Sequence, residues 1–464
     1  MIKNLGIFLL FVVFSLPLLA NETTEAAPAE RTLEDRRRDT LRFGTETEIA
    51  NLIQTIRTER FTYLDDELIE IAENTRNRNI LSGIFGFFTE MDKVGLEDRA
   101  ARAIRERDYE NNETVLASIS YLSRVRNPAA VDDLRELVDS GESRFLNSAI
   151  RALGRSAGAD TQSDNSDSIA NDTALFLLDY YNRRSPTDET RNDLVFAMGE
   201  TRSSETVSFL SDLASNNDER PIIRMSALEA IAKIGDEAGL DAVIQAVSSS
   251  DPNVRSSAVA ALGPFPGEEA ERAVLEAFRD SNFRSRTSAA QAAGRRRLES
   301  AVPFLRFRAE NDEVPAVRDE AIRALGAINN SESMAILDTL FTTRRNSDRI
   351  RLVAAEMLLQ NDPDTYSRRV FIEMQEAQRT NQTPLYNGFV RIMGPVRSVN
   401  LEDIARHFLS GGIIERALAL DMIMNNEFRN FEEEIRSMLD ERRHGASLAR
   451  RAERTLEALG LEVN

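Results

Sequence analysis

Apolar and polar residues follow one helical pattern that recurs in thirteen copies along the chain. Each copy approximates Arg-x-x-Ala-x-x-Ala-Leu-Gly, in which small and apolar residues stand three or four positions apart and so share one helix face. We call the apolar residue before the Gly position the pivot. The pivots are Ile53, Phe87, Leu122, Leu153, Met198, Ile231, Leu262, Ala293, Leu325, Leu358, Met393, Ile423 and Leu456. They lie 30–35 residues apart, except for one interval of 45. This period predicts a stacked repeat array, because no single unit buries its apolar face alone.

Small residues occupy fixed places around the pivots. Ala stands four residues earlier in eight copies, at Ala149, Ala227, Ala258, Ala289, Ala321, Ala354, Ala419 and Ala452. Gly follows the pivot in six copies, at Gly154, Gly199, Gly263, Gly294, Gly326 and Gly394. A face of small residues lets a neighbouring helix approach closely. The Gly is compatible with two roles, since it either ends the first helix of the unit or allows a tight helix crossing.

A second apolar helix follows the first in each unit, for example at residues 238–247 and 301–307. Helix starts are marked by a capping side chain before a proline, as in Asp251-Pro252 and Ser185-Pro186. The period-two alternation typical of strands is absent over any useful length. The sequence therefore predicts an all-α protein, a right-handed α-solenoid of about 12–13 helical hairpins.

Arginine stands seven residues before seven of the pivots, at Arg191, Arg224, Arg255, Arg286, Arg318, Arg351 and Arg416. An acidic residue precedes each of them, at Asp188, Asp218, Asp251, Asp280, Asp312, Asp348 and Glu415. This stripe predicts a structural ladder of Asp and Arg pairs that ties consecutive units together at one edge. The alternative is a groove of arginines that grips carboxylates.

The motif resembles the HEAT-like repeats of the phycobilin-lyase type, whose units open with Val-Arg-x-x-Ala-x-x-Ala-Leu-Gly and continue into a Leu-rich helix. The copies nearest to this phrase run from Val254 to Gly263 and from Val317 to Gly326, and the resemblance extends over residues 45–464. It implies a HEAT- or armadillo-like superhelix. It implies little about activity, because such repeats occur in scaffolds, bilin lyases and regulators alike.

The first twenty residues are typical of a secretory signal peptide, with Lys3 before an apolar run from Leu5 to Leu19 and Ala20 at the expected cleavage site. A retained signal anchor is the alternative, although the run is shorter than the roughly 20 apolar residues that span a bilayer. Polar residues 21–44 predict a flexible leader. Residues 45–464 predict one continuous solenoid with a disordered, Asp-rich insertion at about 158–172.

The chain carries 58 Lys and Arg against 77 Asp and Glu, a net charge of −19. Removing residues 1–20, which contain one basic and no acidic residue, makes it −20. This balance disfavours nucleic acid as a partner, because it repels phosphate backbones. The absence of Cys excludes disulfides.

One catalytic pattern matches the sequence. Residues Gly154 to Gly158 read Gly-Arg-Ser-Ala-Gly, the Gly-x-Ser-x-Gly phrase of a nucleophile elbow. An elbow needs a strand-to-helix turn, whereas this phrase lies in repeat register on a helix, and the only histidines, His407 and His444, are several units away. Two His and no Cys leave too few ligands for a zinc site. The sequence therefore predicts no catalytic residue, no metal and no cofactor.

These features favour a non-catalytic protein- or peptide-binding scaffold of the bacterial cell envelope, whose concave surface is lined mainly by the second helices. Two alternatives remain, an enzyme of lyase or carboxylate-dependent hydrolase type and a structural component of an envelope assembly. The second-helix faces and the Asp-rich insertion are the expected contact regions. The apolar segment Gly83–Phe88 is a further candidate, although it is more typical of a core.

We expect the mature chain in an envelope fraction to begin at Asn21, as read by mass spectrometry of its N-terminal peptide. Ala20→Arg removes the small residue required at the cleavage site, and should leave the signal attached. A wild-type chain that begins at Met1 in the same fraction contradicts cleavage and favours the retained anchor.

Overall fold

The computed structural model describes residues 32–159 and 166–463, and every regular element within these ranges is a helix. The predicted signal peptide and residues 21–31 of the predicted leader lie outside the described residues. The chain forms two compact units, Met1–Phe87 and Phe88–Asn464. Over the described ranges, no helix combines the length and the apolar character needed to span a bilayer.

The first unit contains α1 (Leu33–Phe43), α2 (Glu46–Glu59), α3 (Asp65–Asn74) and most of α4 (Arg78–Glu90). Helix α1 corrects the expectation of a flexible leader up to residue 44. It forms because Thr32 and Asp35 make a capping box and because Leu41 is buried. α1 packs against α2 and α3.

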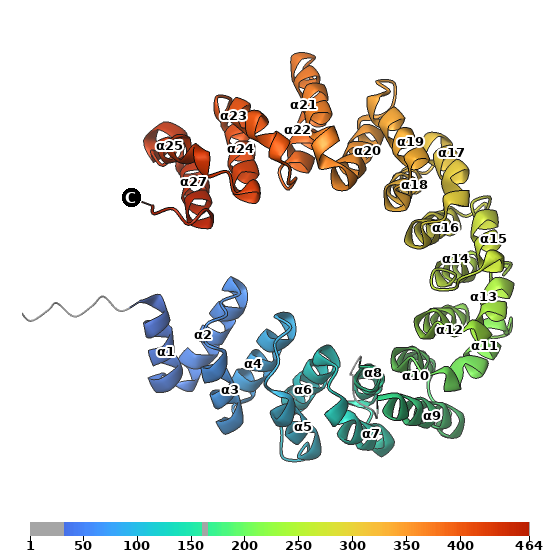
Figure 1. Ribbon diagram of the computed structural model, residues 1–464. Coiled ribbons are helices and arrows are strands. Elements are labelled where there is room, and N and C mark those ends of the chain that lie inside the picture. Colours follow the sequence, from blue (N-terminus) through green and yellow to red (C-terminus); the bar gives the residue numbers. More distant parts are fainter. Residues whose placement is uncertain (1–31, 160–165, 464) are drawn as a thin grey trace, which may run out of the picture. The chain divides into compact units, whose positions relative to one another are not determined.

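The second unit repeats a helical hairpin (Figure 1). We call the helix that carries the pivot the A helix, and the helix that follows it the B helix. The A helices are α6 (Asn112–Val125), α8 (Leu146–Ala157), α10 (Asp188–Thr201), α12 (Pro221–Ile234), α14 (Pro252–Ala261), α16 (Phe283–Arg296), α18 (Pro315–Ile328), α20 (Asp348–Asn361), α22 (Thr383–Met393), α24 (Ile413–Asn426) and α27 (Ala446–Ala458). The B helices are α5 (Glu97–Arg105), α7 (Val131–Ser140), α9 (Ser166–Arg184), α11 (Val207–Ser215), α13 (Leu240–Ala246), α15 (Glu268–Ala277), α17 (Val302–Asn311), α19 (Ser331–Thr342), α21 (Pro363–Arg379), α23 (Glu402–Leu409) and α25 (Glu432–Ser437).

Short elements connect the helices. A short helix, α26 (Glu441–His444), precedes α27. Turns of 3-10 helix lead into several B helices, at Pro128–Ala130 (η1), Ser204–Thr206 (η2), Glu237–Gly239 (η3), Glu299–Ala301 (η4), Val399–Leu401 (η5) and Arg429–Phe431 (η6).

The A helices pack on one another through the small residues of the motif. All thirteen pivots are at most 1% exposed. At Gly154, Gly199, Gly294 and Gly326, an added Cβ would lie 2.5–3.1 Å from the residue that precedes the next pivot. These glycines therefore allow a tight crossing and do not end the helix. Several A helices end later, at a left-handed residue four positions after the pivot, namely Arg126, Arg202, Gly235, Arg297, Asn329 and Glu427.

This packing decides which layer lies inside the curve of the second unit. Successive A helices contact one another along much of their length, whereas successive B helices touch at fewer positions. In Figure 1 the A helices of this unit line the inner side of its curve and the B helices the outer side. The expectation that second helices line the concave surface is therefore wrong, because the smaller side chains belong to the first helices.

The structure tests two further expectations, for the Asp-rich insertion and for the apolar segment Gly83–Phe88. Residues 166–172, predicted as part of a disordered insertion, form the first turns of the long B helix α9, and residues 160–165 lie outside the described part of the chain. The long helix accounts for much of the 45-residue interval. In the segment Gly83–Phe88, the core interpretation is confirmed, because Ile84, Phe85, Phe87 and Phe88 are fully buried.

Gly199→Ala tests the close approach of the A helices. The new Cβ would lie 2.6 Å from Cα of Ala230, so we expect a loss of about 1–3 kcal/mol of stability from overpacking, seen as a lower melting temperature by circular dichroism.

The matched control is Gly394→Ala, where the nearest atom, Cδ1 of Leu418, is 3.6 Å away and the backbone is helical. This variant should be neutral or gain up to about 1 kcal/mol, because Ala favours helix over Gly. Equal effects of the two substitutions would contradict the role of the Gly in helix crossing.

Candidate binding surface

The ladder arginines reach one unit further than the expected pairs. Arg255 on α14 donates from Nε and Nη2 to both carboxylate oxygens of Asp280, at 2.9 and 3.2 Å, in the loop after α15. Asp251, which precedes Arg255, instead caps α14 by accepting from two backbone N–H groups. Nη1 of Arg255 donates to the carbonyls of Ser249 and Ser250 in the preceding loop, at 2.9 and 3.1 Å. One arginine thus joins two successive loops between units.

The same geometry repeats in the next unit. Arg286 donates to both oxygens of Asp312, at 2.7 and 2.9 Å, and to the carbonyl of Asp280 at 2.9 Å. Arg318 in turn donates to the carbonyl of Asp312 at 2.6 Å. The contacts from Arg255 to Arg318 therefore run without a break across three units.

The remaining predicted arginines contact the B helix or loop before their own A helix, the one after it, or both, with other partners. The contacts are Arg191 with Glu219 and the Tyr181 hydroxyl, Arg224 with the Ala214 carbonyl, Arg351 with Glu373 and the Phe341 carbonyl, and Arg416 with Nδ1 of His444. Asp188 pairs with Arg220 as well as with Arg191. Asp218 and Asp348 are exposed, and the described contacts include no ion pair for either.

The A helices present a second, variable set of side chains on the inner side of the curve. These residues stand six and two positions before the pivot and two positions after it, a spacing of four that keeps them on one helix face. Residues two before the pivot keep part of their surface exposed, as at Arg151, Phe196, Glu229, Arg323 and Arg391, whereas the pivots are buried. We call these three positions on all A helices of the second unit the inner stripe.

Three cations lie over one aromatic ring on the inner stripe of α8, α10 and α12, and a fourth, Arg126 on the cap of α6, joins them through Glu200. The charged groups of Arg151, Arg155 and Lys233 lie 5.5, 5.3 and 5.0 Å from the ring centroid of Phe196. The carboxylate of Glu200 is 2.8 Å from Lys233 and within 3.6 Å of two arginines. We call this group the Phe196 cluster; its members are Arg126, Arg151, Arg155, Lys233, Phe196, Asp193 and Glu200.

The stack of A helices loosens between α22 and α24. A Cβ added at Gly394 would lie 3.6 Å from its nearest neighbour on α24, an ordinary contact distance, and a groove of about 510 Å³ opens there. A second hollow of about 560 Å³ lies between α20 and α22 and shares Arg391 and Pro395 with the first. We call the two hollows the α20–α24 groove. Its apolar lining consists of Leu359, Pro363, Val390, Ile392, Pro395, Val396, Ile413, Ile414, Ala417 and Leu418.

Charged residues stand at the rim of the α20–α24 groove. Nη1 of Arg451 lies 2.6 Å from a carboxylate oxygen of Asp421. Burial raises the pKa of Asp421, and Arg451 offsets only part of this effect. Arg391 and Arg397 are exposed and line the groove without an ion pair among the described contacts.

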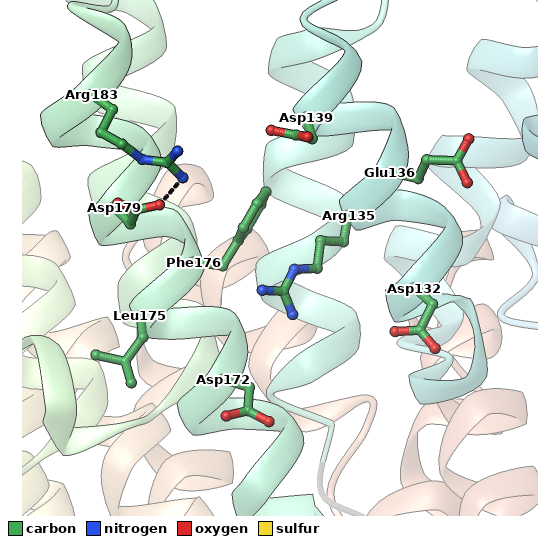
Figure 2. Close-up of a pocket in the computed structure, with 9 residues that line it drawn as sticks. All are labelled: Asp132, Arg135, Glu136, Asp139, Asp172, Leu175, Phe176, Asp179 and Arg183. Carbon is green, nitrogen blue, oxygen red and sulfur yellow. Dashed lines mark hydrogen bonds and ion pairs between the residues drawn. The ribbon is translucent and has the colours of Figure 1, made fainter.

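A different groove lies between the B helices α7 and α9. It has a volume of about 860 Å³ and is lined by Asp132, Arg135, Glu136, Asp139, Asp172, Leu175, Phe176, Asp179 and Arg183. Figure 2 shows Arg135 and Phe176 pointing toward one another across it, with the guanidinium 4.6 Å from the ring centroid, and the ion pair of Arg183 with Asp179. Among the described residues, no three His, Cys, Asp or Glu are grouped to hold a metal ion.

The Gly-x-Ser-x-Gly phrase is explained by helix packing. Ser156 is fully buried within α8, so its hydroxyl is not presented to solvent as in a nucleophile elbow. Gly154 and Gly158 both face the backbone of α10. His407 packs its ring against Phe371 and Phe408.

The chain matches the family model of the spirochaete HEAT repeat protein over residues 41–455. The chain belongs to the spirochaete HEAT repeat family. The HEAT part of the expected resemblance and the all-α solenoid fold are thereby confirmed, whereas the match does not extend to the phycobilin-lyase type. No curated protein matches the sequence at a significant level.

Solved structures resemble the HEAT chain in fold alone. The karyopherin Kap121p bound to the SUMO protease Ulp1p is 11% identical, with a TM-score of 0.43 over 92% of this chain and 54% of that chain. Kap121p bound to Pho4p gives the same score and identity over 92% and 53%. Human deoxyhypusine hydroxylase in complex with glycerol is 18% identical, with a TM-score of 0.25 over 60% and 99%. The chain spans about half the length of the karyopherin.

The inner stripe of the HEAT chain is not part of the predicted binding surface. A usable signal is nevertheless present in the sequence, because positions six and two before the pivot and two after it vary in charge and size while the pivot stays apolar. The α20–α24 groove has a weaker signal, the adjacent Ile413 and Ile414 at the start of a motif helix.

Asp312→Asn tests the buried pair with Arg286, whose side chains are 0% and 6% exposed. Burial raises the pKa of Asp312, but the hydrogen bonds from Arg286 and from a backbone N–H outweigh it, and the pKa lies below its ordinary value. The charged carboxylate therefore stabilises the fold above about pH 4, and this contribution is lost as the pH falls through the folded pKa.

We expect Asp312→Asn to cost about 3–5 kcal/mol at neutral pH, because it leaves a buried arginine unpaired. The difference from wild type should shrink below about pH 4 in urea unfolding followed by circular dichroism. Asp348→Asn, at an exposed aspartate, is the control and should change little. If Asp312→Asn destabilises the protein as much below about pH 4 as at neutral pH, the stabilising role of the ion pair is contradicted.

Proposed function

We propose that this HEAT repeat chain is a non-catalytic scaffold that binds a protein or peptide along the inner stripe, with the α20–α24 groove as its main contact. The observation that carries the proposal is the exposure of two adjacent isoleucines at this groove. Ile413 is 68% and Ile414 53% exposed at the start of α24. Removing such side chains from water is favourable by roughly 25 cal/mol per Å² of apolar surface, and a bound partner would cover them.

The lining of the groove indicates the chemistry of the partner. Apolar side chains fit the two hollows, because each is bounded by aliphatic residues. The exposed guanidiniums of Arg391 and Arg397 at the rim favour carboxylates next to those apolar side chains. We therefore expect a peptide that carries apolar residues flanked by acidic ones.

The proposal also places the scaffold in the bacterial cell envelope. This part rests on the predicted signal peptide at residues 1–20. The acidic net charge supports a protein or peptide partner over nucleic acid.

A displayed random-peptide library tests the proposal with the purified mature chain. We expect the enriched peptides to combine apolar and acidic residues. In fluorescence anisotropy, the Ile413→Ser and Ile414→Ser double variant should bind these peptides at least about tenfold more weakly than the wild-type chain does.

The control is Val399→Ser in η5, which removes an apolar side chain that is 78% exposed and does not line the groove. Its affinity should equal that of wild type, and melting curves should show that all variants are folded. The proposal fails when no peptide is enriched, or when Val399→Ser weakens binding as much as the double isoleucine variant does.

A further inference from the structure

The Phe196 cluster has the opposite charge to the rest of the molecule. The chain has a net charge of −19. In the cluster, Arg126, Arg151, Arg155 and Lys233 form ion pairs with two carboxylates, Asp193 and Glu200. Within the cluster, the cations therefore exceed the carboxylates by two, and Glu229 lies outside it, one helical turn from Lys233.

The carboxylates lie beneath the cations. The side chains of Asp193 and Glu200 are 2% and 4% exposed, whereas those of the four cations are 31–50% exposed. Burial raises the pKa of Glu200, but Lys233 and the neighbouring arginines outweigh it and the pKa lies below its ordinary value, so the group is charged at neutral pH. The layer that meets solvent is consequently positive.

Packing holds the cations in place. Phe196 lies under three of them, and Nη1 of Arg155 donates to the Ser123 hydroxyl at 3.2 Å. Three members also stand near the C-terminal ends of α6, α8 and α12, where the helix dipole favours a positive charge. A guanidinium has five N–H donors, and the described contacts of Arg126 and Arg155 use one or two of them. Donors thus remain for an external anion.

We infer that the Phe196 cluster binds an acidic segment of a polypeptide, through carboxylates held by Arg126, Arg155 and Lys233. This inference deepens the proposed function, because it assigns a second contact of defined charge to the same inner stripe. It also stands on separate residues, since no member of the cluster lines the α20–α24 groove.

A polypeptide fits this cluster better than a nucleic acid does. A nucleic acid binds through a long series of phosphates, and the acidic surface of the remaining chain repels such a backbone. A single arginine holds one carboxylate in a bidentate manner, so a compact group of cations suffices for a short run of Asp or Glu.

The test measures binding of a fluorescein-labelled oligoglutamate peptide to the mature chain by anisotropy. The double variant Arg155→Gln and Lys233→Gln should bind roughly tenfold more weakly or worse, the loss expected for charge-assisted hydrogen bonds. Glu200→Gln should bind more tightly, because it removes the buried carboxylate that competes for the same cations.

The matched control is the double variant Arg295→Gln and Arg323→Gln, which removes two positive charges from the inner stripe of α16 and α18. It should bind like wild type at the same salt concentration. If both double variants lose the same affinity for oligoglutamate, the effect depends on net charge alone and the inference is wrong. The inference is also wrong if a single-stranded oligonucleotide of equal charge binds more tightly than oligoglutamate.

The two proposals fail in different ways. Loss of oligoglutamate binding in the Phe196 cluster variant, with peptide binding intact at the α20–α24 groove, supports two separate contacts. If Ile413→Ser and Ile414→Ser abolish oligoglutamate binding in the folded protein, the anion binds at the groove and the inference is wrong. If the library yields no peptide but the cluster variant still loses oligoglutamate, the proposed groove fails and the cluster stands.

Discussion

The close approach of successive A helices is the constraint on which the second unit depends. At Gly199 an added Cβ would lie 2.6 Å from the backbone of Ala230, so the two helices cross with almost no side chain between them. Gly inside a helix costs about 1 kcal/mol relative to Ala, and its presence there indicates that packing outweighs this cost. Successive A helices contact one another more extensively than successive B helices do, and the unit curves with the A helices inside.

The arginine ladder supplies a different tie at the edge of the same layers. Helix crossing at glycines fixes the spacing of neighbouring A helices but leaves the loops between units with carbonyl groups that need donors. Arg255 and Arg286 meet this need, since each donates to carbonyls of one loop and to both oxygens of an aspartate in the next. An ion pair with such geometry depends on the register of the units, and it adds directional specificity to contacts that are otherwise apolar.

Much of this fold is predictable from the sequence, because a period of 30–35 residues and a buried pivot leave few architectures. The sequence does not predict the register of the ladder, that is, which aspartate each arginine pairs with. Asp251 and Asp280 both precede a ladder arginine, and spacing alone does not show that Arg255 reaches forward to Asp280 while Asp251 caps its own helix. The inner face is also missed, since amphipathic patterns show which side of a helix is buried but not which of two layers faces inward. Helix α1 is missed because its apolar content is low, and a capping box at Thr32 starts it.

A repeat that fixes the backbone leaves specificity to the positions that the packing does not use. On the inner stripe the same position, two before the pivot, holds Arg151, Phe196 and Arg391 in different units, because the A helices touch on other faces and tolerate any of these side chains there. Around α8, α10 and α12 this freedom produces a positive surface over buried carboxylates, and near α24 a looser crossing at Gly394 produces an apolar hollow. The contacts that build the solenoid are thus separate from those that we assign to binding. Such a separation lets one chain carry two chemically distinct surfaces without altering the spacing of its helices.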